Sequence, residues 1–258
     1  MSPALLEIEK LTKSFGGVHA VRECTFSVPE GQVVGLIGPN GAGKSTVIDL
    51  VSGFGQPDSG RITFAGEPLV GKRPDVISRL GLIRTFQTPR EWRNLTVIDN
   101  VLLARRRFAT ESLWRSMTRA RRIRREEEPD RVAVRAILDR FQLTELKNER
   151  AVRLSGGQKR LLEFARIAAA EPRLIILDEP MGGVNPVLGA RIGEAVRQFA
   201  REGRTVIVVE HNLPFIEKTC HQVIVMDVGE VIAQGPFAGL RADRRVVDAY
   251  LGMDQSHE

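Results

Sequence analysis

The residues with the clearest chemical role form a glycine-rich loop that ends in a lysine and a serine. Residues 38–46 read Gly-Pro-Asn-Gly-Ala-Gly-Lys-Ser-Thr, after an apolar run at 33–37 and before a helix-like segment at 46–51. This order of strand, loop and helix is the context of a phosphate-binding loop. Glycine lets the backbone pass close to an anion, and N–H groups of the loop and the helix start point at the phosphates.

The loop also supplies a cation and a metal ligand. Lys44 would reach the β- and γ-phosphates of a nucleotide, and the hydroxyl of Ser45 would bind Mg²⁺. A glycine turn with a chance Lys-Ser pair is the alternative, and the sequence context argues against it. The predicted phosphate-binding residues are Gly38, Pro39, Asn40, Gly41, Ala42, Gly43, Lys44, Ser45 and Thr46.

Two adjacent carboxylates, Asp178 and Glu179, follow an apolar run at 174–177. A continuous apolar run of this kind suits a strand that is buried on both faces. In a phosphate-loop protein, an aspartate at the end of such a strand holds Mg²⁺, usually through water. Glu179 is then placed to polarise an attacking water as a general base. A solvent-facing acid pair at a strand end is the alternative interpretation.

A second glycine-rich helix start lies at Leu154-Ser155-Gly156-Gly157-Gln158. Ser155 can cap the helix that follows, while the two glycines open the backbone, so the segment has the makings of a second anion site. One chain needs only one phosphate loop to bind a nucleotide. We therefore expect this second start to face the nucleotide of another subunit.

These residues need strands and helices to position them. Apolar patterning predicts strands at 5–11, 21–28, 61–66, 174–177 and 205–209, and a hairpin of 223–226 with 230–233. The first three strands indicate an antiparallel sheet beside the phosphate loop. Helical spacing occurs within 97–147, with a break predicted at 126–130 because of its proline, and again at 161–170 and 187–201.

Composition excludes several classes of protein. The 258 residues, 42% of them hydrophobic, suffice for one large α/β domain or for one domain with an inserted lobe. No run approaches the roughly 18 apolar residues of a spanning helix, and no secretory signal is visible, so we do not expect the chain to cross a membrane by itself. Cys24 and Cys220 form no disulfide framework, and we interpret both as buried thiols in a reducing compartment.

The positive charge of the chain has a local source. Residues 105–125 hold nine arginines and one acid, a net charge of +8, whereas the whole chain carries +6. The basic character therefore belongs to one segment and not to a surface spread over the fold. The segment could be a solvated helical face, could lie against anionic lipid or could bind nucleic acid.

The motifs, in their order along the chain, resemble those of the ATPase subunits of ABC transporters. The phosphate loop comes first, the Ser155 segment and then Asp178-Glu179 follow, and a lone His211 stands after the strand at 205–209. The resemblance covers essentially the whole chain. It implies an α/β fold, in which a phosphate-loop, RecA-like core carries an antiparallel β subdomain and an inserted α-helical lobe.

The resemblance also implies how the chain is divided, as a single ABC ATPase domain over residues 1–258. Residues 1–88 and 160–240 would form the α/β core with the β subdomain. Residues 89–159 would form the helical lobe with the Arg-rich insertion at 105–130, and residues 241–258 a short C-terminal tail.

In this family two subunits sandwich two ATP molecules, so the implied cofactors are ATP and Mg²⁺. Each nucleotide is held by the phosphate loop of one subunit and by the second helix start of the other. In this sequence the residues that match that helix start are Ser155, Gly156, Gly157 and Gln158.

Three further residues match family positions. Gln87 corresponds to the glutamine that senses Mg²⁺ and the attacking water, His211 to the switch histidine that contacts the γ-phosphate, and Phe15 to the aromatic residue that stacks on adenine. The alternatives are an ordinary loop amide, a polar strand end and a core phenylalanine. The implied catalytic residues are thus Glu179, His211, Gln87 and Lys44, and the implied metal ligands Ser45, Gln87 and Asp178.

Within the family, the chain is most similar to the ATPases of branched-chain amino-acid importers. The similarity lies in residues 84–87 and 93–101, the Arg-rich insertion, Asn185 and the ending 247–252. The family commonly has aspartate near position 185, so asparagine there keeps the hydrogen-bonding shape but loses a charge. With this asparagine, the sequence does not determine how the two ATP sites of a dimer are coupled.

The similarity implies partners and a location. The partners would be a second, identical or related ATPase subunit, two transmembrane permease subunits and, indirectly, a solute-binding protein, with no nucleic acid, at the cytoplasmic face of the cell membrane. An importer of urea or short-chain amides is one alternative. A soluble ABC ATPase that acts on nucleic acid or ribosomes is the alternative of another class, and a non-catalytic regulatory cassette is a third possibility.

Overall fold

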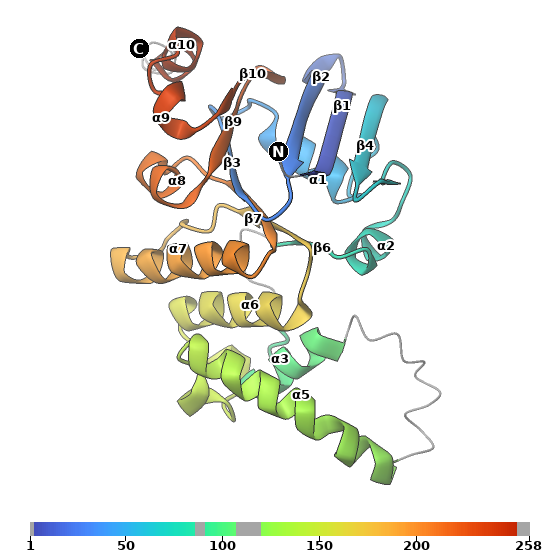
Figure 1. The fold of residues 1–258 in the computed structure, drawn as a ribbon, viewed down its shortest axis with the longest axis vertical. Coiled ribbons are helices and arrows are strands. Elements are labelled where there is room, and N and C mark those ends of the chain that lie inside the picture. Colours follow the sequence, from blue (N-terminus) through green and yellow to red (C-terminus); the bar gives the residue numbers. More distant parts are fainter. Residues whose placement is uncertain (1–2, 86–90, 107–119, 252–258) are drawn as a thin grey trace. The chain divides into compact units, whose positions relative to one another are not determined.

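The computed structural model describes residues 3–85, 91–106 and 120–251 of the chain. Two compact units divide it: residues 1–87 with 173–258, called the α/β unit here, and residues 88–172, called the helical unit. Each unit is described by itself. Figure 1 shows the strands gathered in the first unit and the helices α3, α5 and α6 in the second.

A six-stranded sheet of mainly parallel strands forms the centre of the α/β unit, in the order β10-β9-β3-β8-β7-β6. Its strands are β3 (Val33–Ile37), β6 (Leu82–Arg84), β7 (Leu174–Asp178), β8 (Thr205–Val209), β9 (Gln222–Asp227) and β10 (Glu230–Gly235). Every residue of β3, β7 and β8 is buried, as their unbroken apolar runs predict. Only β10 is antiparallel to its neighbour, which confirms the predicted hairpin.

A second, antiparallel sheet completes the α/β unit. It consists of β1 (Ala4–Phe15), β2 (Val18–Pro29), β4 (Ser59–Phe64) and β5 (Glu67–Pro68), in the order β2-β1-β4-β5. The apolar residues Leu6, Ile8 and Ile62 on its inner face join one buried cluster with Ile48 of helix α1 (Lys44–Val51). The predicted antiparallel sheet beside the phosphate loop is therefore confirmed, and its core holds α1 in place.

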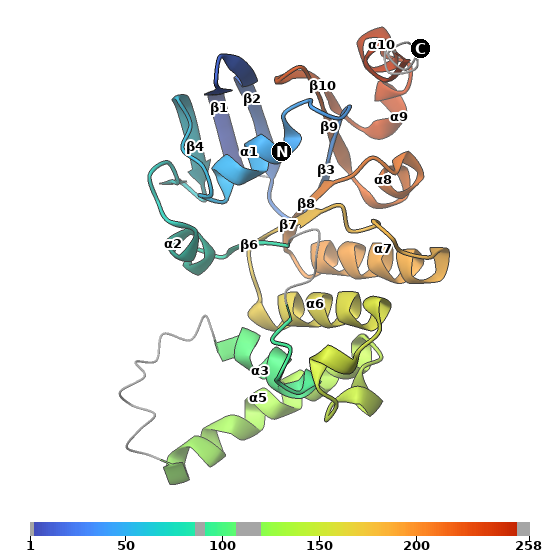
Figure 2. The same ribbon diagram turned by 180° about the vertical axis from the view of Figure 1, so that it is seen from behind.

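Helices connect the parallel strands. Besides α1, the α/β unit contains α2 (Pro74–Arg79), α7 (Pro186–Arg201), α8 (Leu213–Thr219), α9 (Phe237–Leu240) and α10 (Arg244–Leu251). Helix α7 begins where Asn185 accepts a hydrogen bond from the N–H of Leu188 at 2.9 Å, and Pro186 occupies its first turn. Helices α9 and α10, which lie in and just before the predicted tail, pack near β10 (Figure 2).

The helical unit is built from α3 (Val97–Arg106), α5 (Ala120–Arg140) and α6 (Gly156–Ala170), with short 3-10 turns at Thr144–Leu146 and Ala151–Arg153. Helices α3 and α5 both pack against α6. The predicted lobe boundary at residue 159 falls inside α6. Because α6 is one continuous helix, the helical unit extends to residue 172.

The predicted helix break at residues 126–130 is wrong. Helix α5 runs from Ala120 to Arg140 with Pro129 inside it. Proline removes one N–H donor from a helix, but its fixed φ of about −65° is itself helical, so a helix can continue through it at some cost in stability. Pattern alone overestimated that cost here.

No helix among the described residues is long and apolar enough to cross a bilayer. The two cysteines are free; Cys24 is buried, whereas Cys220 is partly exposed, so the prediction of two buried thiols holds in full only for Cys24. Burial raises the pKa of both thiols to about 12, so neither is a thiolate at neutral pH.

Candidate functional site

The phosphate loop, Asp178, Glu179 and His211 lie at one edge of the parallel sheet. Strands β3, β6, β7 and β8 run parallel, so their carboxyl ends lie at the same edge. Gly38 follows β3, Asp178 ends β7 with Glu179 directly after it, and His211 lies two residues beyond β8. The carboxyl edge of an open α/β sheet is where such folds bind ligands.

Two glycines of the phosphate loop are required because neighbouring backbone comes very close. A Cβ on Gly38, at φ 147°, would lie 2.0 Å from the carbonyl oxygen of Met226, and one on Gly43, at φ 94°, would lie 2.4 Å from that of Ala20. Gly41, at φ 82°, has no heavy atom within 4 Å of its Cβ position. The loop is therefore pinned at both ends and open in the middle, a shape that fits a phosphate chain.

Helix α1 directs its positive end at this open space. Gly43, its N-cap residue, provides no side-chain cap, so the first-turn N–H groups have no such partner. Lys44 Nζ donates to the carbonyl oxygens of Gly38 and Pro39, each at 2.7 Å. The ammonium thus lies against the loop, where a bound phosphate would meet it together with the helix dipole.

Opposing effects act on the charge of Lys44. Burial lowers the pKa of the lysine, whereas the negative charges of Glu179 and Asp178 raise it, with burial the larger effect. Both acids stand at the carboxyl end of β7, and the loop that leads to Lys44 leaves the carboxyl end of β3 at the same edge of the sheet. The structure therefore brings together a cation for phosphates and two acids, as the sequence predicts.

Asp178 is held by an arginine that the motif analysis missed. Arg84, at the end of β6, donates to Asp178 Oδ2 at 3.0 Å and to Asp49 Oδ1 of α1 at 2.5 Å. The backbone N–H of Asp178 also donates to the hydroxyl of Thr85. An arginine at the end of a short apolar strand was the available signal, but its two partners depend on strand order. Arg84 ties the metal-binding candidate to the helix that begins at Lys44.

Glu179 adopts an unusual backbone conformation. Its φ is 46°, in the left-handed region that few non-glycine residues occupy, and its N–H donates to the carbonyl of Val209 at 2.9 Å. Such strain, which costs about 1–3 kcal/mol, persists only where the surrounding structure enforces it and is common at active sites. The loop after β7 is therefore fixed to β8 at the residue proposed as general base.

A second residue missed by the sequence reasoning lies after β8. The side chain of Glu210 is fully buried, while that of its neighbour His211 is 72% exposed. His211 Nδ1 lies 3.9 Å from Glu210 Oε2. The switch-histidine candidate thus projects outward from a buried anchor, at the same sheet edge as Glu179.

The residues present fit Mg²⁺ as well as phosphate. Ser45 is exposed in the first turn of α1, and the carboxylate of Asp178, at the end of β7, is linked through Arg84 to Asp49 of the same helix. Oxygen ligands of these two kinds suit Mg²⁺ in a nucleotide site. Gln87, the third predicted ligand, lies outside the described residues. Phe15 ends β1 with 58% of its surface exposed, so it is not a core residue, and Lys13 Nζ lies 5.3 Å from its ring centroid.

The second helix start, in the helical unit, has the predicted cap. Ser155 Oγ accepts from the N–H of Gln158 at 3.3 Å, and Gln158 Oε1 accepts from the N–H of Ser155 at 2.9 Å, which is a reciprocal capping box. Ser155 and Gly156 are exposed, and a Cβ on Gly156 would meet nothing within 4 Å. Whether this open surface meets another subunit's nucleotide stays a prediction.

Arg105, the first arginine of the Arg-rich segment, and the nearby Trp92 both have partners inside the helical unit. The guanidinium of Arg166 stacks 4.1 Å from the Trp92 ring centroid. Arg105 pairs with Asp130 at 2.7 Å and with Glu171 at 2.9 Å. Trp92 therefore contributes to the packing of this unit. The remaining arginines of the segment lie outside the residues whose side chains are described.

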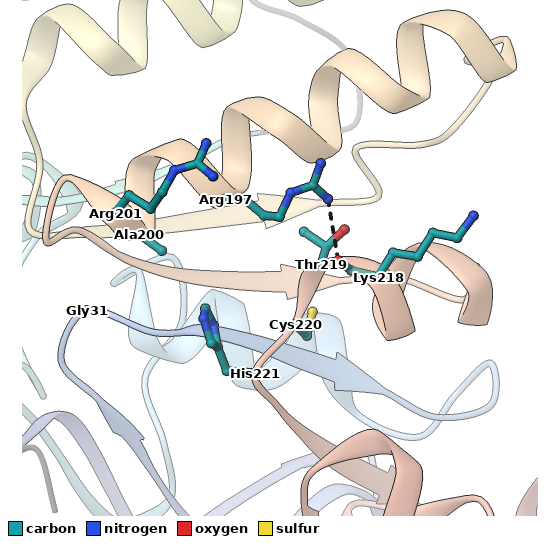
Figure 3. A pocket seen from close by; sticks show the side chains of 8 residues that line it. All are labelled: Gly31, Arg197, Ala200, Arg201, Lys218, Thr219, Cys220 and His221. Atoms are coloured by element: carbon teal, nitrogen blue, oxygen red, sulfur yellow. Dashed lines mark hydrogen bonds between the residues drawn. The ribbon is translucent and has the colours of Figure 1, made fainter.

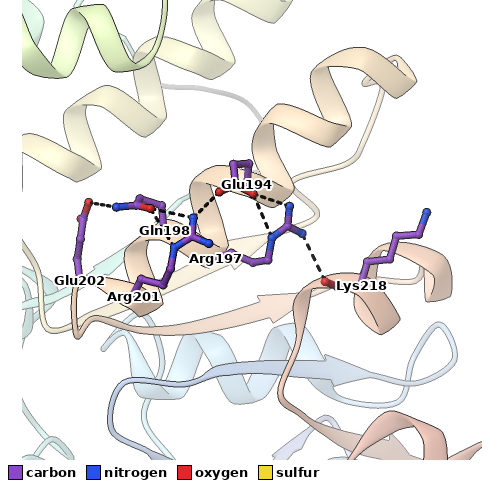
Figure 4. A network of polar contacts seen from close by, with 6 residues as sticks. All are labelled: Glu194, Arg197, Gln198, Arg201, Glu202 and Lys218. Carbon is purple, nitrogen blue, oxygen red and sulfur yellow. Dashed lines mark hydrogen bonds and ion pairs between the residues drawn. The ribbon is translucent and has the colours of Figure 1, made fainter.

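A separate hollow of about 410 Å³ lies at the opposite, amino ends of β3 and β9, where Figure 3 shows His221 beside Gly31. Two of its basic residues, Arg197 and Arg201 of α7, both donate to Glu194, as Figure 4 shows. Within the part of the chain that the structure describes, none of the predicted site residues lines this hollow.

The model of the ABC transporter family matches residues 21–182, well over half of the chain. The chain belongs to the ABC transporter family. As a member it is an ATP-binding cassette, and its ATP hydrolysis is coupled to transport. The predicted family, fold class and ATPase activity are thus confirmed.

Relatives and solved structures agree with the family. The probable branched-chain amino acid transport ATP-binding protein LivG of Archaeoglobus fulgidus is 38% identical over 98% of this chain and 97% of its own length. The high-affinity branched-chain amino acid transport ATP-binding protein BraF of Pseudomonas aeruginosa is 35% identical over 98% and 99%. The crystal structure of an ABC-transporter cassette in its ADP conformation superposes with a TM-score of 0.81 at 33% identity, covering 97% of this chain and 100% of that one.

Proposed function

We propose that this chain is the ATP-hydrolysing subunit of an importer for branched-chain amino acids or closely related solutes. The observation that carries the proposal is the carboxyl edge of the parallel sheet, where a pinned phosphate loop, Lys44 and the pair Asp178-Glu179 converge. The relatives named above, which match nearly the whole chain, are transport proteins for branched-chain amino acids. Their names favour this solute class over urea, short-chain amides and a role on nucleic acid.

Each residue then has a distinct task. The N–H groups at the start of α1 and the ammonium of Lys44 hold the phosphates of ATP, and Ser45 with Asp178 would hold Mg²⁺. Bound Mg²⁺ would neutralise charge that develops on the phosphates. Glu179 accepts a proton from the attacking water, and His211 contacts the γ-phosphate from the neighbouring strand end. Gln87 would complete the metal site, and Phe15 would stack on adenine.

The assembly follows from the second helix start. We infer that two cassettes face each other, so that Ser155, Gly156, Gly157 and Gln158 of one cover the nucleotide held by the other. The second cassette is identical or related, and both would attach to two permease subunits at the cytoplasmic face of the membrane. A solute-binding protein would act on the permeases and touch this chain only indirectly.

Uptake measured in cells tests the solute class. A strain that lacks this chain should lose import of labelled leucine, and the wild-type gene should restore it, whereas a Glu179→Gln gene should not. Glu194→Gln, which changes an exposed carboxylate on α7, is the matched control and should restore import. Unchanged leucine uptake in the deletion strain, together with lost urea uptake, would overturn the proposed solute class.

A further inference from the structure

Glu210 is a buried acid to which none of the motifs gives a task. It follows β8 directly, and its side chain has 0% of its surface exposed. A carboxylate is rarely buried so completely unless hydrogen bonds satisfy its oxygens. Its surroundings therefore need a specific explanation.

The two oxygens of Glu210 accept hydrogen bonds from two different loops. Oε1 accepts from the backbone N–H of Met181 at 2.7 Å. Oε2 accepts from the backbone N–H groups of His211 at 3.0 Å and of Asn212 at 3.2 Å. Hydrogen bonds to an ionised acceptor are the strong ones, and bonding through both oxygens also fixes direction. One side chain thus joins the loop after β7 to the loop after β8.

These two loops carry the proposed general base and the proposed switch histidine. Met181 is two residues after Glu179, and His211 is next to Glu210 itself. The strands before them are paired in register, with Asp178 opposite Val209, and the N–H of Glu179 donates to Val209. The sheet therefore sets where both loops begin, and Glu210 adds a connection beyond the sheet edge.

The strained backbone of Glu179 explains why a connection between the two loops is needed. A non-glycine residue at φ 46° relaxes unless the chain on both sides is held. The bond from the Glu179 N–H to Val209 holds the residue itself, and the bond from the Met181 N–H to Glu210 holds the turn two residues later. Loss of the second bond would free the loop that aims the base.

We propose that Glu210 is a positioning residue that fixes the Glu179 loop and the His211 loop to each other. It acts through these residues and does not touch the nucleotide. The proposal rests on the proposed function, because it takes Glu179 and His211 as the groups that act on ATP. Reaction rates are sensitive to such positioning, since a displacement of about 1 Å can cost about 10²-fold.

Glu210→Gln is the sharpest substitution, because it keeps the size of the side chain. Its single oxygen can accept from one loop, and its NH₂ group then faces an N–H donor of the other. The expected result is a fall in kcat of about tenfold or more, with nucleotide affinity within about threefold of wild type. Glu194→Gln, which alters a hydrogen-bonded carboxylate on the exposed face of α7, should leave both unchanged.

The outcomes separate positioning from a general effect on folding. Wild-type turnover by Glu210→Gln would overturn the proposal. A parallel loss of kcat, nucleotide affinity and thermal stability would overturn it too, because that pattern describes a residue needed only for folding.

A double-mutant cycle with His211→Ala tests the route of action, with rates measured as single turnovers of labelled ATP. If Glu210 works through His211, its substitution should cost much less in the His211→Ala background than in wild type. Fully multiplicative losses would overturn the coupling between the two residues.

Hydrogen exchange tests the connection directly. The amides of Met181, His211 and Asn212 should exchange slowly in wild type, and those of one loop should exchange faster in Glu210→Gln. Unchanged exchange in all three would overturn the link. Glu179→Gln distinguishes the two levels of the account: full activity of that variant refutes the proposed base, whereas an inactive Glu179→Gln beside a normal Glu210→Gln refutes only the positioning role.

Discussion

Two helices in this molecule begin at glycine-rich segments that have different structures. The first, at α1, is pinned between neighbouring backbones, and its helix has no side-chain cap. The second, at α6, is exposed, carries a complete capping box formed by Ser155 and Gln158, and has open space at Gly156. Close backbone contacts exclude a Cβ from Gly38 and Gly43 at the first start, whereas a Cβ would fit at Gly156 in the second.

The two starts differ in which ligand each can bind within a single chain. The α1 start has its N–H groups, Lys44 and two nearby carboxylates within one chain, so it is equipped to hold a nucleotide unaided. The α6 start satisfies part of its own hydrogen bonding through the capping box, and its residues Ser155 and Gly156 are exposed. We expect it to bind a ligand only when another molecule brings one to it.

The largest effect is expected from Glu179→Gln, which removes the proposed base beside the first start. Turnover should fall about 10²-fold or more, while ATP binding survives, because the phosphate loop is intact. Steady-state ATPase assays and equilibrium nucleotide titrations measure the two quantities. A variant that hydrolyses ATP at the normal rate would show that Glu179 is not the base.

A matched pair of glycine substitutions compares the two starts directly. Gly38→Ala should lower the free energy of unfolding by about 3 kcal/mol or more, because its Cβ would lie 2.0 Å from the Met226 carbonyl. Gly156→Ala should cost no stability, since its Cβ meets open space in a helix. Denaturant unfolding of both variants provides the values. Equal losses at the two sites would contradict the contrast.

Much of this site could be predicted from the sequence, because its signals are local. A few neighbouring residues suffice to predict the loop at 38–46, the Ser155 cap and the acids at the end of β7. The links between them could not be predicted. Arg84 meets Asp178 only because β6 pairs with β7, and Glu210 meets Met181 only because β7 pairs with β8. Neither strand pairing can be predicted from the residues of a single segment.

The wrong prediction has a local cause as well. Proline lacks an N–H, so the sequence predicts a helix break at Pro129, yet α5 continues through it. The balance between one lost hydrogen bond and the stability of a 21-residue helix cannot be judged from the residue type alone. The predicted lobe boundary at residue 159 lies within α6, which is one continuous helix.

Ser155→Ala should have a smaller effect and lower the free energy of unfolding by about 1 kcal/mol, because it removes the cap of α6. Nucleotide binding by the monomer should be unchanged, whereas hydrolysis by the assembled transporter should fall. Thermal unfolding and a titration with a fluorescent nucleotide measure the first two. Weakened binding by the monomer would mean that the α6 start already acts within one chain.

Asn185→Asp should have the smallest effect. An aspartate can still accept from the Leu188 N–H and adds a negative charge at the N-terminus of α7, worth about 0.3–1 kcal/mol of added stability. The melting temperature should rise slightly, with the Asn185→Ala variant, which removes the cap, as the opposite control. A drop in stability for Asn185→Asp would show that the uncharged amide is needed there.

The most direct test is a calorimetric titration of monomeric protein with Mg²⁺-ATP, in the Glu179→Gln background so that nucleotide is not consumed. The account predicts one site per chain, strongly weakened by Lys44→Ala and unaffected by Ser155→Ala. Binding that survives Lys44→Ala, or that depends equally on Ser155, would contradict the assignment of the nucleotide to the carboxyl edge of a single chain.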